Sequence, residues 1–281
     1  MRTNYSSVRT VGIVCLLGLL IIPALADALP KALSVPGGIA LVRLGAVTTP
    51  SDAPRAWLGD QPVLVASENG QWTAVVGLAL DLPVGAQELR VEDGVRQRTL
   101  RFDVGTKKYP EQRIHLKDSG KVQLSPDDET RALGEIATIQ NIKRHWRMAD
   151  DTETRLVRPV VEGRLASRFG LRRVFNGEPR APHVGLDLAV PRGTSVKASA
   201  PGLVLAVGDY FFNGKTVFLD HGNGLISMYC HLDRIDVQAG DPVTRGQGVG
   251  LSGMTGRASG PHLHWSVILN GVMVDPELFL D

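Results

Sequence analysis

Short runs of alternating apolar and polar residues fill most of the chain. A period of two is typical of strands that bury one face. In residues 33–104 such runs are separated by turn sequences, including Glu68-Asn69-Gly70 and Glu92-Asp93-Gly94, which favour hairpins. From residue 157 to 281, strand patterns again alternate with Gly- and Pro-rich turns. The alternation therefore predicts an all-β fold, with strand-rich regions in both halves of the chain.

One segment departs from this pattern and predicts a helix. Ser125 is a suitable N-cap, Pro126 suits the first helical position, and acidic residues follow at 127–129, where they complement the helix dipole. Four aliphatic residues at helical spacing would form an apolar stripe: Leu133, Ile136, Ile139 and Ile142. We expect this stripe to pack against a domain.

These patterns divide the chain into four parts. Residues 1–26 have a basic start, an apolar run too short for a typical membrane span and a small-residue cleavage site, which indicates a secretory signal peptide. An uncleaved N-terminal anchor is the alternative. We expect a small β-sandwich in residues 27–106, a connector with the helix in 107–156, and an antiparallel β-sheet or barrel-like domain in 157–281.

Composition and charge narrow the range of functions. The chain has 281 residues, of which 43% are hydrophobic and 21% charged, as in ordinary globular proteins. Removal of residues 1–26 takes away two of 31 basic residues and none of 29 acidic ones, which leaves 29 of each. This balance gives no support for nucleic acid as a partner. Cys230 would be the one cysteine left, so the sequence predicts no internal disulfide.

The histidines indicate a metal site. Five of the seven lie between residues 183 and 264. His183 and Asp187 belong to one alternating stretch, and His262 and His264 are two residues apart, which places both on one strand face. Catalytic zinc sites typically have three N or O ligands and an open position for water. His183, Asp187 and one member of the His262/His264 pair would supply these ligands.

The spacing of His183 and Asp187 restricts this hypothesis. In an extended strand, residues four apart are separated by about 13 Å at Cα, too far for two side chains to meet on one ion. We therefore expect His183 to lie in the loop before the strand, or Gly185 to allow a bend.

Several stretches together resemble a known family. They are His183-Val-Gly-Leu-Asp187, Asp220-His-Gly-Asn-Gly-Leu, Met228-Tyr-Cys-His231-Leu and Thr255-Gly-Arg-Ala-Ser-Gly-Pro-His262-Leu-His264. In order and spacing they are similar to the lysostaphin-type (LytM-like) zinc metallopeptidases of bacterial cell walls. The resemblance implies that His183, Asp187 and His264 bind one zinc ion per chain. It also implies that His231 and His262 are catalytic, orienting water and stabilising the tetrahedral intermediate; it leaves the substrate-binding residues unknown.

The same resemblance implies a function and a location. We expect a zinc endopeptidase that hydrolyses the peptide cross-links of peptidoglycan, at D-alanyl-diaminopimelate bonds in a Gram-negative envelope. The first half of the chain is similar to the N-terminal module of exported Gram-negative members, which implies a periplasmic protein, or one anchored in the inner membrane if the signal is not cleaved. We expect a monomer, with a possible envelope partner for the N-terminal module.

Two other classes of function compete with this one. The first is a non-catalytic LytM-like regulator that activates another wall hydrolase; it shares the fold but should not retain a full set of metal ligands. The second is a lipoyl- or biotinyl-type carrier barrel, which needs a lysine at a hairpin tip that the Gly222-Asn223-Gly224 turn lacks. Of the remaining candidates, we expect a structural role for His221, solvated positions for His115 and His145, and a buried, unreactive Cys230.

Overall fold

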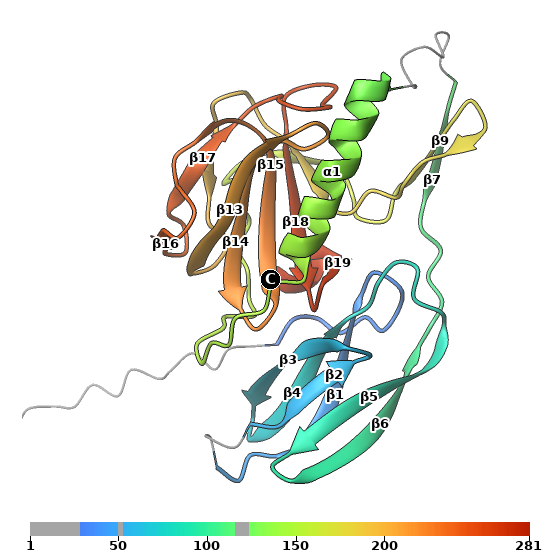
Figure 1. Cartoon of the computed structure of the whole chain (residues 1–281), viewed down its shortest axis with the longest axis vertical. Coiled ribbons are helices and arrows are strands. Elements are labelled where there is room, and N and C mark those ends of the chain that lie inside the picture. Colours follow the sequence, from blue (N-terminus) through green and yellow to red (C-terminus); the bar gives the residue numbers. More distant parts are fainter. Residues whose placement is uncertain (1–28, 50–52, 116–123) are drawn as a thin grey trace, which may run out of the picture.

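The structure is a computed structural model that describes residues 29–49, 53–115 and 124–281. The expected signal peptide lies outside the described residues. Two domains are stacked end to end, and one long helix lies against the C-terminal domain (Figure 1). Both domains are built from strands, which confirms the all-β class. No helix within the described ranges has the length and apolar character needed to cross a membrane.

The N-terminal domain is a curled six-stranded sheet. Its strands follow one another in the spatial order β1-β4-β3-β2-β5-β6. Their bounds are β1 (Ile39–Ala46), β2 (Arg55–Leu58), β3 (Gln61–Glu68), β4 (Gln71–Gly77), β5 (Gly85–Asp93) and β6 (Arg96–Val104). Buried residues from both halves of this sheet, among them Val42, Ala74, Leu89 and Val91, form one core between them. The sheet thus encloses its core as the two layers of a sandwich would.

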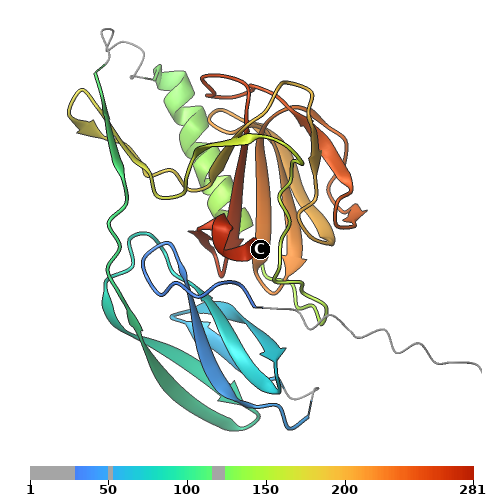
Figure 2. The same ribbon diagram turned by 180° about the vertical axis from the view of Figure 1, so that it is seen from behind.

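The connector consists of a strand and a helix. Strand β7 (Glu111–Ile114) leaves the N-terminal domain and forms a parallel pair with β9 of the C-terminal domain, as Figures 1 and 2 both show. Helix α1 (Pro126–Lys143) begins as expected, because the Ser125 side chain accepts a hydrogen bond from the Asp128 amide. Figure 2 gives the view from behind, in which the same strand runs from one domain to the other.

The expected apolar stripe of the helix is only half right. Ile139 and Ile142 pack against the C-terminal domain, but Leu133 is 61% exposed and Ile136 44% exposed. In the first half of the helix a polar residue, Glu135, faces the sheet instead, and its carboxylate accepts a hydrogen bond of 2.5 Å from the Phe211 amide. The helix is therefore held by apolar packing at its C-terminal end and by polar contacts nearer its N-terminal end.

The C-terminal domain is a strongly curved, barrel-like antiparallel sheet with the main strand order β16-β13-β14-β15-β18-β11-β8. Its central strands are β13 (Gly202–Tyr210), β14 (Gly214–Gly222), β15 (Leu225–Ile235), β18 (Leu263–Leu269) and β11 (Leu186–Ala189). Shorter strands complete this sheet: β8 (Arg164–Ser167), β12 (Ser195–Lys197), β16 (Pro242–Val243), β17 (Gly248–Ser252) and β19 (Val272–Val274), followed by a 3₁₀ helix at Pro276–Phe279. Strands β9 (Arg172–Phe175) and β10 (Glu178–Pro179) form a separate three-stranded sheet with β7, in the order β10-β9-β7.

The alternation along β18 separates the two faces of this sheet. Leu263, Trp265 and Val267 point into the main core. Ile268, on the other face, belongs to the cluster that Ile139 and Ile142 of α1 cover. Since His264 differs from Ile268 by an even number of residues, it lies on the same face as α1. The helix therefore borders the face of the sheet on which the candidate ligands lie.

An asparagine joins the two domains. Asn270 is buried in the β18–β19 turn, and its side chain forms two hydrogen bonds with the backbone of Gly77 at the end of β4. Its Oδ1 accepts from the Gly77 amide at 2.6 Å, and its Nδ2 donates to the Gly77 carbonyl at 3.1 Å. The side-chain amide of Asn270 thus forms the two backbone hydrogen bonds with Gly77, the last residue of β4, that a neighbouring strand would otherwise form.

We expect Asn270→Ala to lower the free energy of unfolding by about 2–3 kcal/mol, because it leaves the buried Gly77 amide and carbonyl without partners. Urea denaturation measures this change. Asn69→Ala is a matched control, since Asn69 has a similar left-handed backbone, with φ of 51° against 41°, but lies at an exposed hairpin tip. An equal decrease in the free energy of unfolding in the two variants would show that the hydrogen bonds between Asn270 and Gly77 do not stabilise the contact between the domains.

Candidate metal centre and active site

Strand pairing brings two of the expected ligands together. In the antiparallel pair of β11 and β18, Asp187 lies directly opposite His264, so their side chains project from the same face. The Asp187 Oδ1 atom lies 2.9 Å from His264 Nδ1. The register of this strand pair therefore brings the carboxylate and the imidazole together.

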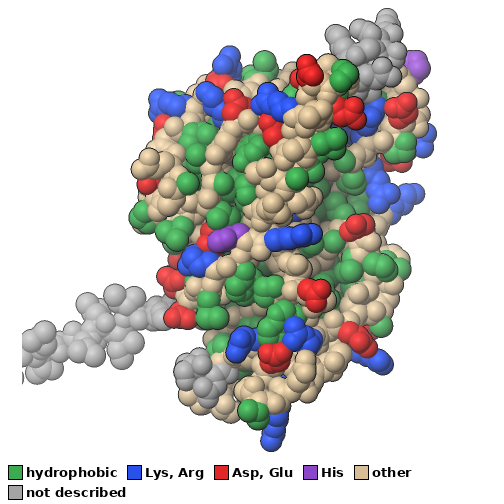
Figure 3. All heavy atoms as spheres, viewed as in Figure 1, with side chains coloured by type: hydrophobic (Ala, Val, Ile, Leu, Met, Phe, Trp, Pro, Cys, Tyr) green, Lys and Arg blue, Asp and Glu red, His purple; other side chains and the backbone are tan. Residues whose placement is uncertain are grey.

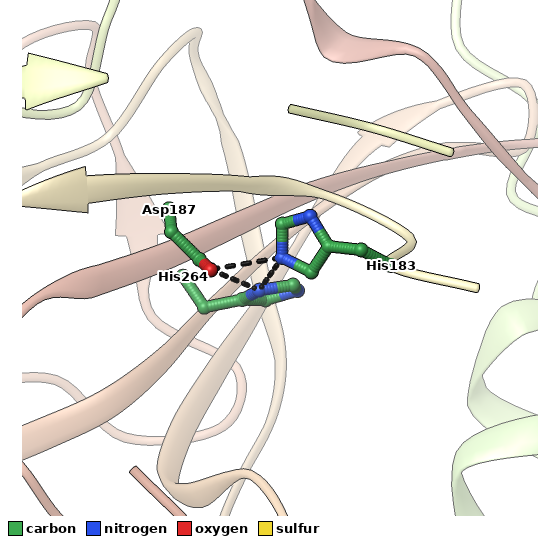
Figure 4. Close-up of side chains that lie close together, drawn as sticks. All are labelled: His183, Asp187 and His264. Atoms are coloured by element: carbon green, nitrogen blue, oxygen red, sulfur yellow. Dashed lines mark hydrogen bonds and ion pairs between the residues drawn. The ribbon is translucent and has the colours of Figure 1, made fainter. Parts of the chain in front are cut away.

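The third side chain arrives from a loop. His183 precedes the first residue of β11 by three positions, and its Nε2 lies 2.9 Å from Asp187 Oδ1 and 3.0 Å from His264 Nδ1. Figure 4 shows the three side chains pointing toward one another. The position of His183 in the loop meets the geometric requirement that the sequence imposed.

Backbone contacts hold this loop in place. The His183 amide donates to the Leu171 carbonyl at 2.9 Å, and the His183 carbonyl accepts from the Gly170 amide at 2.7 Å. The next residue but one, Gly185, lies so close to β18 that an added Cβ would be 2.6 Å from Ser266 Oγ and 2.7 Å from His264 Nε2. A glycine at this position lets the loop approach the strand closely enough for His183 to reach Asp187.

The outer nitrogen of each ligand imidazole has a polar partner. His183 Nδ1 lies 2.9 Å from the Arg168 carbonyl, to which it can only donate, and His264 Nε2 lies 2.8 Å from Ser266 Oγ. In the tautomers that bind a metal, the hydrogen lies on these outer nitrogens, which leaves lone pairs at His183 Nε2 and His264 Nδ1 for a cation beside the Asp187 carboxylate. Such outer contacts orient the imidazoles of metal sites.

The cluster fits a small cation. Three lone-pair donors converge on one point, with 2.9–3.0 Å between their atoms, close to the roughly 3.3 Å that separates ligand atoms around tetrahedral zinc. Burial alone would raise the pKa of Asp187, but its hydrogen bonds with His183 and His264 outweigh burial and lower that pKa. Burial lowers the pKa of His264. A carboxylate and a neutral imidazole are the forms that bind metal.

The remaining two expected site residues lie beside this cluster. The rings of His231 and His262 are 4.7 Å apart between centroids, and the ring of His231 is 6.1 Å from that of His264. His262 Nε2 lies 3.7 Å from Asp187 Oδ1. Both rings are held through Nδ1, His231 by the Thr255 carbonyl at 2.9 Å and His262 by the Gly260 carbonyl at 2.8 Å. Their Nε2 atoms are therefore the ones that carry a lone pair.

An irregularity in β15 directs His231 into the site. Its φ of 61° lies in the left-handed region, which is uncommon for residues other than glycine. The strand register shifts here, and the His231 amide donates to the Asn213 carbonyl at 2.8 Å. This residue is also largely buried, and burial lowers the pKa of His231 to about 4. The neutral imidazole is thus the stable form near neutral pH.

The structure also shows which groups hold the imidazoles in place, and the sequence alone did not predict them. The hydroxyl of Ser266, two residues after His264 on the same strand face, could have been found from the period of two. The carbonyls of Arg168, Thr255 and Gly260 could not, because they are backbone groups that any residue type supplies. The five expected residues lie close together in the structure. Their roles as metal ligands and catalytic groups stay a prediction.

The other candidate residues have structural surroundings. His221 is buried and contacts the Pro201 carbonyl and Ser227 Oγ, each at 2.7 Å. Cys230 is buried as expected, and burial raises the pKa of its thiol to about 12. His145 is less free than expected, because its Nε2 lies 3.5 Å from the buried carboxylate of Asp220.

Comparison with known proteins places this geometry in a family. Residues 181–276 match the model of peptidase family M23, and residues 32–107 match that of the peptidase family M23 N-terminal domain. A crystal structure of a putative peptidase M23 from Pseudomonas aeruginosa is 42% identical, covers 88% of this chain and 95% of that chain, and superposes with a TM-score of 0.73. The chain belongs to peptidase family M23. Its resemblance to lysostaphin-type peptidases is thereby confirmed.

Relatives with assigned activities match less than half of this chain. Peptidoglycan DD-endopeptidase ShyA of Vibrio cholerae is 44% identical over 109 residues, which are 38% of this chain and 25% of that protein. DD-carboxypeptidase/endopeptidase Mpg of Neisseria meningitidis is 38% identical over 120 residues, which are 43% of this chain and 28% of that protein. The match thus spans about a quarter of the length of these relatives.

We expect His264→Ala to abolish stoichiometric binding of a divalent metal, because it removes one of three converging donors and leaves the buried carboxylate with one imidazole. Metal content per folded chain, measured after dialysis, tests this. His115→Ala is the control, since that imidazole is exposed and lies in the connector, outside the cluster. Unchanged metal content in His264→Ala would show that the ion binds elsewhere.

Proposed function

We propose that this M23 protein is a zinc endopeptidase that hydrolyses the peptide cross-links of peptidoglycan. The observation that supports this most directly is the completeness of the site: His183, Asp187 and His264 converge on one point, with His231 and His262 beside them. The names of the relatives ShyA and Mpg, both endopeptidases, support the same reaction. Cleavage at D-alanyl-diaminopimelate bonds is part of the proposal.

The donor set suits zinc better than the harder divalent ions. Two imidazole nitrogens and one carboxylate oxygen match a catalytic zinc site, whereas Mg²⁺ and Ca²⁺ prefer oxygen ligands. When bound, zinc polarises the scissile carbonyl and lowers the pKa of bound water. One ion per chain would be held by His183 Nε2, Asp187 Oδ1 and His264 Nδ1.

His231 and His262 provide the acid–base groups. Each donates its Nδ1 hydrogen to a backbone carbonyl, so the proton that moves during the reaction is taken up and released at Nε2. Because the pKa of His231 is lowered to about 4, its ring is neutral near neutral pH and accepts a proton. Once protonated, the same Nε2 atom donates to the developing oxyanion or to the leaving amine.

The location and partners of the protein follow from this substrate. Peptidoglycan lies outside the cytoplasmic membrane, so we propose export by the N-terminal signal to the periplasm, either released or anchored to the inner membrane. We propose that the enzyme acts as a monomer, and that the N-terminal domain contributes contacts with the wall or with an envelope partner.

A non-catalytic regulator of another wall hydrolase is the competing function. A regulator needs the fold and a binding surface, but no converging ligands and no pair of imidazoles with free Nε2 atoms. The presence of both in this chain favours the enzyme.

We expect His231→Asn to retain bound metal but to lower the rate of cross-link cleavage by a factor of about 10²–10⁴, the range for removal of a general acid–base group. Asparagine tolerates the left-handed backbone of this position, so the imidazole is removed without added strain. Mass spectrometry of digested peptidoglycan measures cleavage, and His115→Asn is the matched control. Wild-type cleavage by the His231 variant would remove this residue from the reaction.

A further inference from the structure

A polar pocket lies at the junction of the two domains, near the candidate active site. Its volume is about 400 Å³, within the range of small-ligand sites. Three parts of the chain line it. They are Gln61 and residues 79–81 from the N-terminal domain, Gln140, Lys143 and Arg144 at the end of α1, and Val184 with residues 270–273 from the C-terminal domain. The pocket thus exists only because the N-terminal domain is docked.

Strand register places this pocket beside the candidate metal ligands. Met273 in the lining pairs with Ile268 of β18, which shares the α1-facing side of that strand with His264. Four residues along a strand correspond to about 13 Å. Val184 in the lining directly follows His183 in the chain. A peptide whose scissile bond lies at the metal centre therefore reaches the pocket within about four extended residues.

The charges in the pocket are of both signs. Lys143 and Arg144 come from the end of α1 and Asp81 from the N-terminal domain. Figure 3 shows basic and acidic side chains near the junction of the two domains. None of the ion pairs within 4.0 Å that occur among the described residues involves any of these three.

Lys143 is held in this position with little compensation for its charge. It is partly buried, and its Nζ donates to Gln140 Oε1 at 3.1 Å. Burial and then the neighbouring Arg144 lower the pKa of Lys143, and the charge of Asp81 opposes them. A bound carboxylate would stabilise both cations, while a bound ammonium group would be stabilised by Asp81.

We propose that this interdomain pocket is a substrate subsite that binds a zwitterionic amino-acid group, with its carboxylate at Lys143 and Arg144 and its ammonium at Asp81. The identity of the peptide that bears this group rests on the proposed function. Diaminopimelate in a peptidoglycan stem peptide has such a group at its free end. The N-terminal domain is then part of the substrate site, because it supplies Asp81 and Gln61.

Binding measurements on the full chain test this directly. The probe is an uncross-linked stem peptide ending in diaminopimelate. It is compared with a form amidated at the distal carboxylate and with a form acetylated at the distal amine.

We expect Lys143→Met to weaken binding of the unmodified peptide about tenfold and to leave binding of the amidated peptide unchanged. Asp81→Asn should weaken binding of the unmodified peptide but not of the acetylated one. Arg96→Gln, on an exposed strand of the N-terminal domain, should change neither.

Two results would overturn the proposal: no preference of the wild-type chain for the zwitterionic peptide, or the same affinity change for all three peptides in the Lys143 and Asp81 variants. These measurements need no hydrolysis. A chain that discriminates the peptides but does not cleave cross-linked wall fragments would retain the pocket and refute the proposed enzyme. A chain that cleaves but does not discriminate would refute the pocket alone.

Discussion

The pairing of Asp187 with His264 across β11 and β18 is the contact on which the site depends. Directly opposite residues of an antiparallel pair project from one face, so the register alone brings the carboxylate and the imidazole within 2.9 Å. A slip of one residue would turn either side chain into the core. Removing a carboxylate from water costs several kcal/mol unless charges or hydrogen bonds compensate it. The two imidazoles give part of that compensation, and a cation between them would complete it.

Much of this arrangement could be predicted from local patterns. The period of two identified the strands and placed His264 on a polar face, and the capping sequence at Ser125 located the start of the helix. The distance limit between residues four apart on a strand correctly put His183 in a loop. These features depend on near neighbours in the chain, where spacing and residue type are sufficient.

Other features depend on contacts between distant segments and could not be predicted in this way. The left-handed backbone of His231 results from its bond to Asn213 in the neighbouring hairpin. Ile136 fits the helical apolar stripe by spacing, yet it is exposed because Glu135 faces the sheet and bonds the Phe211 amide. The N-terminal domain contacts the C-terminal domain through the side chain of Asn270, in the sequence simply the Asn of an Asn-Gly turn, and through buried apolar residues such as Ile39 and Val75.

The connector strand β7 has a consequence for how the two halves of the chain relate. It pairs with β9, and the Tyr109 ring just before it packs so closely on Gly170 that an added Cβ there would lie 2.0 Å from the ring. Gly170 in turn bonds the His183 carbonyl. A fragment that begins at residue 157 would therefore lack the contacts that support its ligand loop, and the edge of β9 that pairs with β7 would be unpaired.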